Sequence, residues 1–316
     1  MTTSENSSQK ALPLIFGEVL FDCFPDSQVL GGAPFNVAWN LQGLGLSPAV
    51  ITAVGDDELG RIVIDRAASW NIDRSGIQVS SFPTGRVDIS TENGEPTYTF
   101  WDNVAFDQIV ADEKYFNNRS PSLLYHGSLA LRGNESRETL FKLRSDLKVC
   151  PIFVDINLRL PHYDFALTES ILKGVSHLKL NHEELDLLHQ FLFQTCSDDE
   201  IERGSEAANQ ALLWEHRQRT AHELQQRFGI QHIWLTAAEQ GAAWLGPEGA
   251  FEVVQAPRVG NLVDTVGAGD ALTAVIIHGL SQCRSPIAIL RDAVQFAAKV
   301  CQIRGATSAD ASFYQL

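Results

Sequence analysis

The amino-acid sequence predicts an α/β protein in which a mainly parallel central sheet is flanked by helices. Short strand-like runs recur along the 316 residues, and helical patterns lie between most of them, as is typical of parallel strands joined by crossover helices. The hydrophobic content of 44% is enough to form a substantial core. We expect a disordered polar tail at residues 1–11 and one folded domain over residues 12–316.

The expected elements begin with a strand, a glycine turn and a helix. The run LPLIFGEVLFDCF (12–24) indicates a buried strand that continues into a more alternating one. The run GGAPFNVAWNLQGLG (31–45) indicates a turn and then a helix with Pro34 in its first position. Further strands are predicted at 48–55, 121–127, 151–159, 176–181 and 231–238.

One region breaks the alternation of strands and helices. Residues 84–102 alternate with period two on both sides of Asn93-Gly94, the strongest short signal for a hairpin. A hairpin within an α/β chain is a candidate lid, to which we assign residues 19–31 and 84–103. The charge-rich segment 194–227 is expected to form solvated helices with a structural role.

Composition limits the classes of partner and the compartment. The chain has 24 Lys and Arg against 39 Asp and Glu, a net charge of −15, which argues against binding to nucleic acid or to an anionic membrane. The five cysteines are scattered and never spaced C-x-x-C, so we expect reduced thiols rather than disulfides or a zinc site. The polar N-terminus lacks the apolar core of a signal peptide, which favours a cytoplasmic protein.

The stretch DTVGAGDAL (264–272) allows two interpretations. Asp270 could begin a helix over 271–280, because Asp is a favoured N-cap and glycine supplies backbone freedom. Alternatively, three small residues leave their N–H groups unobstructed there and form an anion hole for phosphate, with Asp270 beside the anion as a base. These residues are Gly267, Ala268 and Gly269.

Five motifs follow one another along the chain. They are GGAPFNVA (31–38), VGDDELG (54–60), the N-x-x-E of KLNHEE (179–184), LTAAEQGA (235–242) and DTVGAGD (264–270). In this order, from about Leu14 to about Thr307, the chain resembles the ribokinase-like (PfkB) family of sugar kinases. Neither the P-loop nor the dinucleotide-binding fingerprint occurs, so phosphate binding would take the form that this resemblance implies.

Within the family, the resemblance is strongest to fructokinases. It is carried by GEVLFD (17–22), GGAPFNVA and DINLR (155–159). Two positions depart from the family pattern: Ile156 replaces a usual proline, and Ala238 replaces a glycine that is usual beside the nucleotide.

The resemblance implies phosphoryl transfer from ATP to a sugar hydroxyl. Asp270 would accept the proton of that hydroxyl, and the N–H groups of the preceding turn would stabilise the moving phosphoryl group. Since a helix N-terminus favours a carboxylate, we expect the pKa of Asp270 to be lowered.

On the nucleotide side, the resemblance implies contacts to ATP, Mg²⁺ and K⁺. Asn181 and Glu184 would help to place Mg²⁺ through water, although the same pair is also a capping box in all but its first residue. Asp264 would bind K⁺ or would simply form a turn at a strand end. The expected ATP-binding residues are Asn181, Thr236, Glu239 and Gly241.

On the sugar side, the resemblance implies a set of polar side chains around a glycine pair. Asp22 ends an apolar strand, where it is either a solvated carboxylate or a ligand for sugar hydroxyls. Asp155, Asn157 and Arg159 would share one face of a strand, as sugar or phosphate ligands or as a polar network. The expected sugar-binding residues are Asp22, Gly31, Gly32, Asn36, Asn157 and Arg159.

The function predicted is an ATP-dependent kinase that phosphorylates a small sugar, with D-fructose as the first choice. The alternatives are a kinase for 2-dehydro-3-deoxygluconate, ribose or another ketohexose, and a non-catalytic sugar-binding protein of the same fold. A NAD-dependent oxidoreductase is opposed by the missing fingerprint. The partners expected are the sugar and ATP, without nucleic acid or membrane, and a homodimer through the lid stays open.

Overall fold

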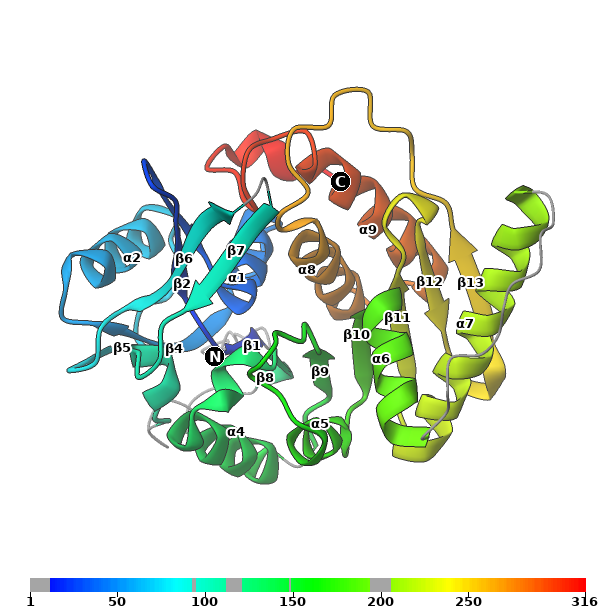
Figure 1. Cartoon of the computed structure of the whole chain (residues 1–316), viewed down its shortest axis with the longest axis horizontal. Coiled ribbons are helices and arrows are strands. Elements are labelled where there is room, and N and C mark those ends of the chain that lie inside the picture. The colour runs from blue at the N-terminus through cyan, green and yellow to red at the C-terminus, as the bar shows by residue number, and fades with distance from the viewer. Residues whose placement is uncertain (1–11, 93–94, 112–120, 148, 194–205) are drawn as a thin grey trace, which may run out of the picture.

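The computed structural model describes residues 12–92, 95–111, 121–147, 149–193 and 206–316. Its largest element in these ranges is a nine-stranded sheet with the order β13-β12-β11-β10-β9-β8-β1-β4-β5 (Figure 1). Neighbouring strands run parallel from β11 to β5, and β12 and β13 are antiparallel to their neighbours. The predicted fold class is therefore confirmed. The strands are β1 (Leu12–Phe16), β4 (Ala49–Gly55), β5 (Ile77–Ser80), β8 (Pro121–His126), β9 (Ile152–Asp155), β10 (His177–Asn181), β11 (His232–Thr236), β12 (Ala242–Leu245) and β13 (Phe251–Val254).

Helices cover both faces of this sheet and enclose a hydrophobic core on each. One core joins the sheet to α1 (Ala33–Gly43), α2 (Glu58–Ser69), α8 (Ala268–Ser281) and α9 (Pro286–Val300). The other joins it to α4 (Asn134–Asp146), α5 (Phe165–Leu172), α6 (His182–Phe193) and α7 (Glu206–Phe228). Apolar runs such as β4, which is buried along its whole length, therefore lie between two helical layers (Figure 1).

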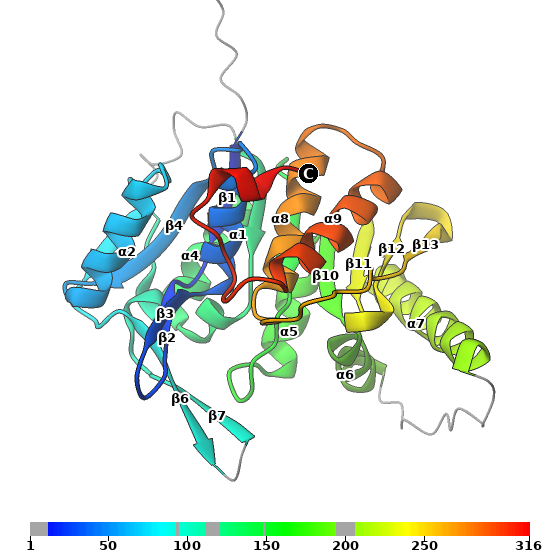
Figure 2. The ribbon, with the colours of Figure 1, turned by 90° about the horizontal axis from the view of Figure 1, so that it is seen from above.

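A second, four-stranded sheet has the order β3-β2-β6-β7. Its strands are β2 (Leu20–Cys23), β3 (Gln28–Gly31), β6 (Gly85–Glu92) and β7 (Glu95–Phe100), and β6 and β7 project away from the body of the molecule (Figure 2). The antiparallel pairing of β6 with β7 confirms the predicted hairpin, although its Asn93-Gly94 turn lies outside the described residues. The Asp57 carboxylate of the VGDDELG motif fixes the base of β6, because it accepts hydrogen bonds from the N–H and hydroxyl of Thr84 at 2.8 and 2.6 Å.

Several predicted boundaries need correction. The strand predicted at 151–159 ends at Asp155, and Asn157 has a φ of +39°, so these residues do not share one strand face with Arg159. Pro34 is the second residue of α1 rather than the first. Residues 242–254 add two short antiparallel strands, so the hairpin at 84–102 is not the only antiparallel segment.

Two further predictions fall partly outside the described residues. The tail 1–11 and residues 194–205 are not described, whereas α7 supplies a helix of 23 residues to the charge-rich segment. Among the helices described, none is both long and apolar enough to cross a membrane.

Candidate active site

Most of the predicted site residues meet at one edge of the large sheet. The parallel strands β1 and β8 to β11 all end there, and in open α/β sheets ligands bind outside the carboxyl ends of the strands. Strand register places Asp155 opposite Lys179 and Asn181 opposite Thr236. The start of α8 lies beside the same edge, since Thr273 in α8 donates to the Asp155 carboxylate at 3.1 Å.

The glycine turn at the start of α8 has the geometry of an anion site. Gly267 is the N-cap and has a φ of +77°, and a Cβ there would lie 2.1 Å from the Ala306 Cβ, so only glycine fits. In the described part of the chain, no side chain caps this helix end. The Ala268 N–H donates to the Thr265 carbonyl oxygen at 3.3 Å, so among the described residues the N–H groups of Gly267 and Gly269 are the ones that suit the oxygen atoms of a phosphate. The second interpretation of this stretch expected Ala268 as well.

Asp270 is the third residue of α8 and not its N-cap, which corrects the first interpretation. Its carboxylate accepts a hydrogen bond of 2.8 Å from the side-chain amide of Asn36 on α1. Burial and the nearby Asp155 raise the pKa of Asp270 to about 6. The expected lowering by the helix N-terminus is therefore wrong, because loss of solvation outweighs the helix dipole. A carboxyl with this pKa is ionised at neutral pH and is a stronger base than an ordinary aspartate.

A buried lysine beneath the glycine turn was missed by the sequence analysis. The Lys179 Nζ donates to the Asp155 carboxylate at 3.0 Å, and both side chains are almost fully buried. The same Nζ lies 3.1 Å from the position that a Cβ on Gly269 would take. Although burial alone would lower it, Asp155 and Glu184 raise the pKa of Lys179, so it carries a positive charge next to the anion site. The available signal was one lysine between two leucines in the buried strand β10.

Asn181 and Glu184 form the reciprocal cap that their spacing predicts. The Asn181 side-chain oxygen accepts from the Glu184 N–H, and the Glu184 carboxylate accepts from the Asn181 N–H, both at 2.8 Å. The other carboxylate oxygen accepts from the N–H of Leu158 at 2.8 Å. Burial raises the pKa of Glu184. One buried carboxyl thus ties the start of α6 to the loop after β9.

The sugar-side residues gather where the small sheet approaches the large one. A Cβ on Gly31 would lie 3.2 Å from the Asp22 carboxylate, and one on Gly32, which has a φ of +100°, would lie 2.7 Å from the Glu18 carbonyl oxygen. Burial raises the pKa of half-buried Asp22, and Arg159 opposes this shift. Among the described residues, no donor lies within hydrogen-bond distance of the Asp22 carboxylate.

Glu18 is a second site residue that the sequence analysis missed. It follows β1 in the GEVLFD run and is 3% exposed, and its Oε2 has no partner among the described residues. Burial and the charge of Asp270 raise the pKa of Glu18 to about 7, while Arg159 acts in the opposite direction. A charged residue directly after a buried strand was the signal that could have identified it.

The expected nucleotide residues lie at the end of β11 and in the short turn that follows. Thr236 is the last residue of β11, and Glu239 is exposed in the turn. Ala238 has a φ of +44°, a conformation that explains why glycine is usual at this position. Gly241 is required for packing, because a Cβ there would lie 2.0 Å from the Val254 carbonyl oxygen.

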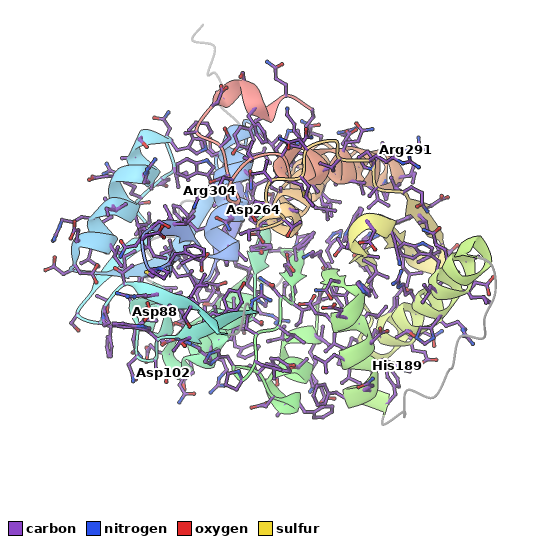
Figure 3. All side chains as sticks on the ribbon, turned by 45° about the horizontal axis from the view of Figure 1, so that its top comes forward. Asp88, Asp102, His189, Asp264, Arg291 and Arg304 are labelled. Atoms are coloured by element: carbon purple, nitrogen blue, oxygen red, sulfur yellow. The ribbon has the colours of Figure 1, made fainter. Side chains whose placement is uncertain are left out.

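Asp264 joins the segment before α8 to the segment after α9. Its two carboxylate oxygens accept hydrogen bonds from the N–H groups of Val266 and Gly305, each at 3.0 Å. Figure 3 shows Asp264 and Arg304 close together in the upper middle of that view. A carboxylate that accepts one bond on each oxygen keeps lone pairs for a further ligand, so the residues present are compatible with a cation.

Comparison with known proteins identifies relatives along the whole chain. An uncharacterized sugar kinase of Pyrococcus horikoshii is 29% identical over 259 residues, which cover 79% of this chain and 73% of that protein. Its crystal structure in complex with ATP superposes with a TM-score of 0.74 over 93% of this chain and 94% of that chain, at 24% identity. A fructokinase of Rhizobium leguminosarum is 26% identical over 278 residues, 84% of this chain and 79% of that protein.

A solved fructokinase of Vibrio cholerae shares the fold. Its structure in the fructose, ADP and potassium ion bound form has a TM-score of 0.74 over 96% of this chain and 97% of that chain, at 21% identity. The family model of the pfkB family carbohydrate kinases matches residues 8–312, nearly the full length. This match includes the glycine turn, the buried lysine and the paired Asn36 and Asp270. Because the family model spans nearly its full length, the chain belongs to the pfkB family of carbohydrate kinases.

Proposed function

We propose that this protein is an ATP-dependent fructokinase that transfers the γ-phosphoryl group to a hydroxyl of D-fructose. The observation that carries the proposal is the position of Asp270, which lies directly after the uncapped glycine turn and is hydrogen-bonded to Asn36. Base and anion site are thus adjacent on one helix end. Phosphoryl transfer requires this adjacency, because the nucleophile and the charge of the moving group must be aligned.

In this mechanism Asp270 accepts the proton of the attacking sugar hydroxyl. The N–H groups of Gly267 and Gly269 and the ammonium of Lys179 would stabilise the charge that develops on the phosphoryl oxygens. Mg²⁺, when bound with ATP, supplies neutralisation of phosphate charge, and Asn181 and Glu184 would hold it through water. Lys179, Asn181 and Glu184 form what we call the donor side of the site. The reciprocal bonds of Asn181 and Glu184 and the bond of Lys179 to Asp155 hold these side chains in place.

On the acceptor side, Asp22 and Asn36 are proposed to bind sugar hydroxyls over the glycine pair Gly31-Gly32, with Asn157 and Arg159 opposite. The half-buried carboxylate of Asp22, which has no hydrogen-bond donor among the described residues, supports this role, because hydroxyl groups would satisfy it. The fructokinases among the relatives favour fructose as the acceptor. Ribose, 2-dehydro-3-deoxygluconate or another ketohexose is the second candidate, because specific acceptor contacts differ within one fold.

Thr236, Glu239 and Gly241 are proposed to line the nucleotide site, and Asp264 to hold K⁺ with carbonyl groups near Val266 and Gly305. The potassium ion in the related fructokinase structure supports this assignment. The small sheet is proposed to act as a lid over the sugar.

The test is an ATP-consumption assay on the purified protein with a panel of sugars. We expect turnover with D-fructose at a kcat/KM at least tenfold above that for ribose, 2-dehydro-3-deoxygluconate and other ketohexoses. Preference for another sugar would replace fructose and retain the kinase. Sugar binding without ATP consumption would overturn the catalytic proposal.

A further inference from the structure

The loop after β9 holds Arg159 by means of a short turn. The backbone N–H of His162 donates to the carbonyl oxygen of Arg159 at 2.8 Å and closes this turn. The exposed Arg159 guanidinium donates to the carbonyl of its neighbour Leu158 at 3.1 Å, a contact within the same loop. The position of Arg159 therefore depends on whatever fixes His162.

The His162 ring contacts the small sheet. It packs edge to face against Phe100, with ring centroids 5.2 Å apart and planes at 77°. Phe100 ends β7 and pairs with Val87 on β6, which in turn pairs with Asp22 on β2. Because neighbouring strands lie about 4.8 Å apart, Phe100 is roughly 10 Å from Asp22 across the small sheet.

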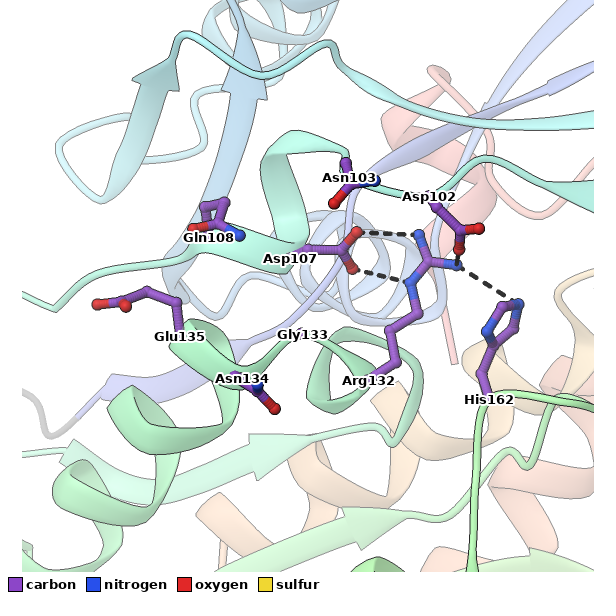
Figure 4. A pocket seen from close by; sticks show the side chains of 9 residues that line it. All are labelled: Asp102, Asn103, Asp107, Gln108, Arg132, Gly133, Asn134, Glu135 and His162. Atoms are coloured by element: carbon purple, nitrogen blue, oxygen red, sulfur yellow. Dashed lines mark hydrogen bonds and ion pairs between the residues drawn. The ribbon is translucent and has the colours of Figure 1, made fainter.

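Arg132 holds the other side of the His162 ring. Its Nη1 lies 3.4 Å from the His162 Nε2 (Figure 4). Its Nη2 donates to the carbonyl of Trp101, directly after β7. Two bonds of 2.8 and 3.1 Å to the Asp107 carboxylate fix the guanidinium, which also lies over the Phe106 ring. Arg132 is thus fixed in position, and it contacts both the residue after β7 and the Arg159 loop.

We assign no ligand to the cavity of about 580 Å³ that lies beside Arg132. Asp107 and Arg132, which line it, already satisfy each other. Burial and the Arg132 charge lower the pKa of His162, which favours the neutral ring, whose Nε2 can accept a hydrogen bond from Arg132.

We propose that His162 is a positioning residue that holds the Arg159 loop in register with the small sheet, so that Arg159 and Asp22 face one acceptor. The inference rests on the proposed sugar kinase function. His162 does not touch the reacting atoms, and it acts through the turn that it closes. Arg132 and Phe100 set its ring from two sides, so the loop follows the end of β7.

A double-mutant cycle of His162→Ala and Arg159→Ala tests this, measured as kcat/KM for the acceptor that the wild type prefers. His162→Ala should lower this value roughly 10- to 100-fold and leave the KM for ATP unchanged, because small misplacements of a positioning residue are costly. In the Arg159→Ala background, His162→Ala should cost less than about twofold. His162→Gln keeps an acceptor for Arg132 and should recover part of the loss, and it replaces His162→Ala in the cycle if that variant does not fold.

The matched control is His189→Ala. His189 is a half-buried histidine on α6, and its Nε2 lies 2.7 Å from the Glu223 carboxylate on α7. It lies far from Asp102 (Figure 3). This variant should change neither constant. Additive effects in the cycle, or an equal rise in the KM for ATP, would overturn the positioning role. A wild type without kinase activity on any sugar would overturn the proposed function, and the inference with it. Additive effects in a wild type that is active would overturn the inference alone, so the two failures can be told apart.

Discussion

The two sides of the candidate active site differ in how far their charges are satisfied before any ligand arrives. On the donor side, Lys179 is paired with Asp155 at 3.0 Å, and Glu184 accepts two backbone bonds of 2.8 Å, all in buried positions. On the acceptor side, half-buried Asp22 has no donor among the described residues, and Arg159 is exposed. We infer that the donor side is preorganised for charge stabilisation, whereas the proposed acceptor side would be completed by the sugar.

The largest effect on activity is expected at the residue where the two sides meet. Asp270→Asn should lower kcat by about 10²–10⁴-fold, the usual contribution of a positioned base, while ATP binding is retained. The Asn36 amide can still bond the new side chain, so the fold should survive. Steady-state kinetics with a nucleotide-binding titration measures both values. Turnover within a few-fold of the wild type would remove Asp270 from the mechanism.

A substitution on the donor side should lower the free energy of unfolding. Lys179→Met leaves Asp155 as an unpaired buried charge, and breaking a buried pair costs about 3–5 kcal/mol. Denaturant unfolding should therefore show a large loss. Adding Asp155→Leu removes the remaining charge and should recover part of the stability without recovering activity. An undiminished free energy of unfolding in Lys179→Met would contradict the preorganised pair.

The acceptor side should behave in the opposite way. Asp22→Ala removes a charged hydrogen-bond acceptor, worth about 1.5–3 kcal/mol, so kcat/KM for the sugar should fall about ten- to a hundredfold. Asp22 accepts no hydrogen bond from the described residues, so Asp22→Ala should change the free energy of unfolding of the protein by less than about 0.5 kcal/mol. Kinetics for fructose and competing sugars, with the KM for ATP alongside, tests this. A defect confined to ATP would leave Asp22 as a solvated strand end.

The sequence was sufficient for the elements with a strong local signal. The Gly31-Gly32 turn and the Asn181–Glu184 cap follow from short spacings, and the β6–β7 hairpin follows from period-two alternation. Strands β12 and β13 have only four residues each, which is too short for a clear period.

Predictions that depended on tertiary contacts were less successful. Lys179 and Glu18 carry only a weak signal in the sequence, a charged residue in or just after a buried strand, and their place in the site depends on α8 and on η2 (Leu129–Arg132). The pKa of Asp270 was misjudged for the same reason, since its burial and its distance from Asp155 are set by the fold. Local spacing determines caps and turns, whereas charge environment is a property of the assembled core.

The smallest expected effect concerns the bond that joins the two sides, from Asn36 to Asp270. With its pKa raised to about 6, Asp270 is the active, ionised base above that pH, so kcat/KM for the sugar should fall about tenfold per unit below pH 6. The Asn36 bond stabilises the ionised form and lowers this pKa, so Asn36→Ala should move the acidic limb to higher pH. Glu18, with a pKa of about 7, is the other buried carboxyl that titrates nearby, and Glu18→Gln serves as the control. A limb that persists in Glu18→Gln and shifts upward in Asn36→Ala belongs to Asp270. A limb that disappears in Glu18→Gln would instead assign the proton to Glu18 and place the base on the acceptor side of the site.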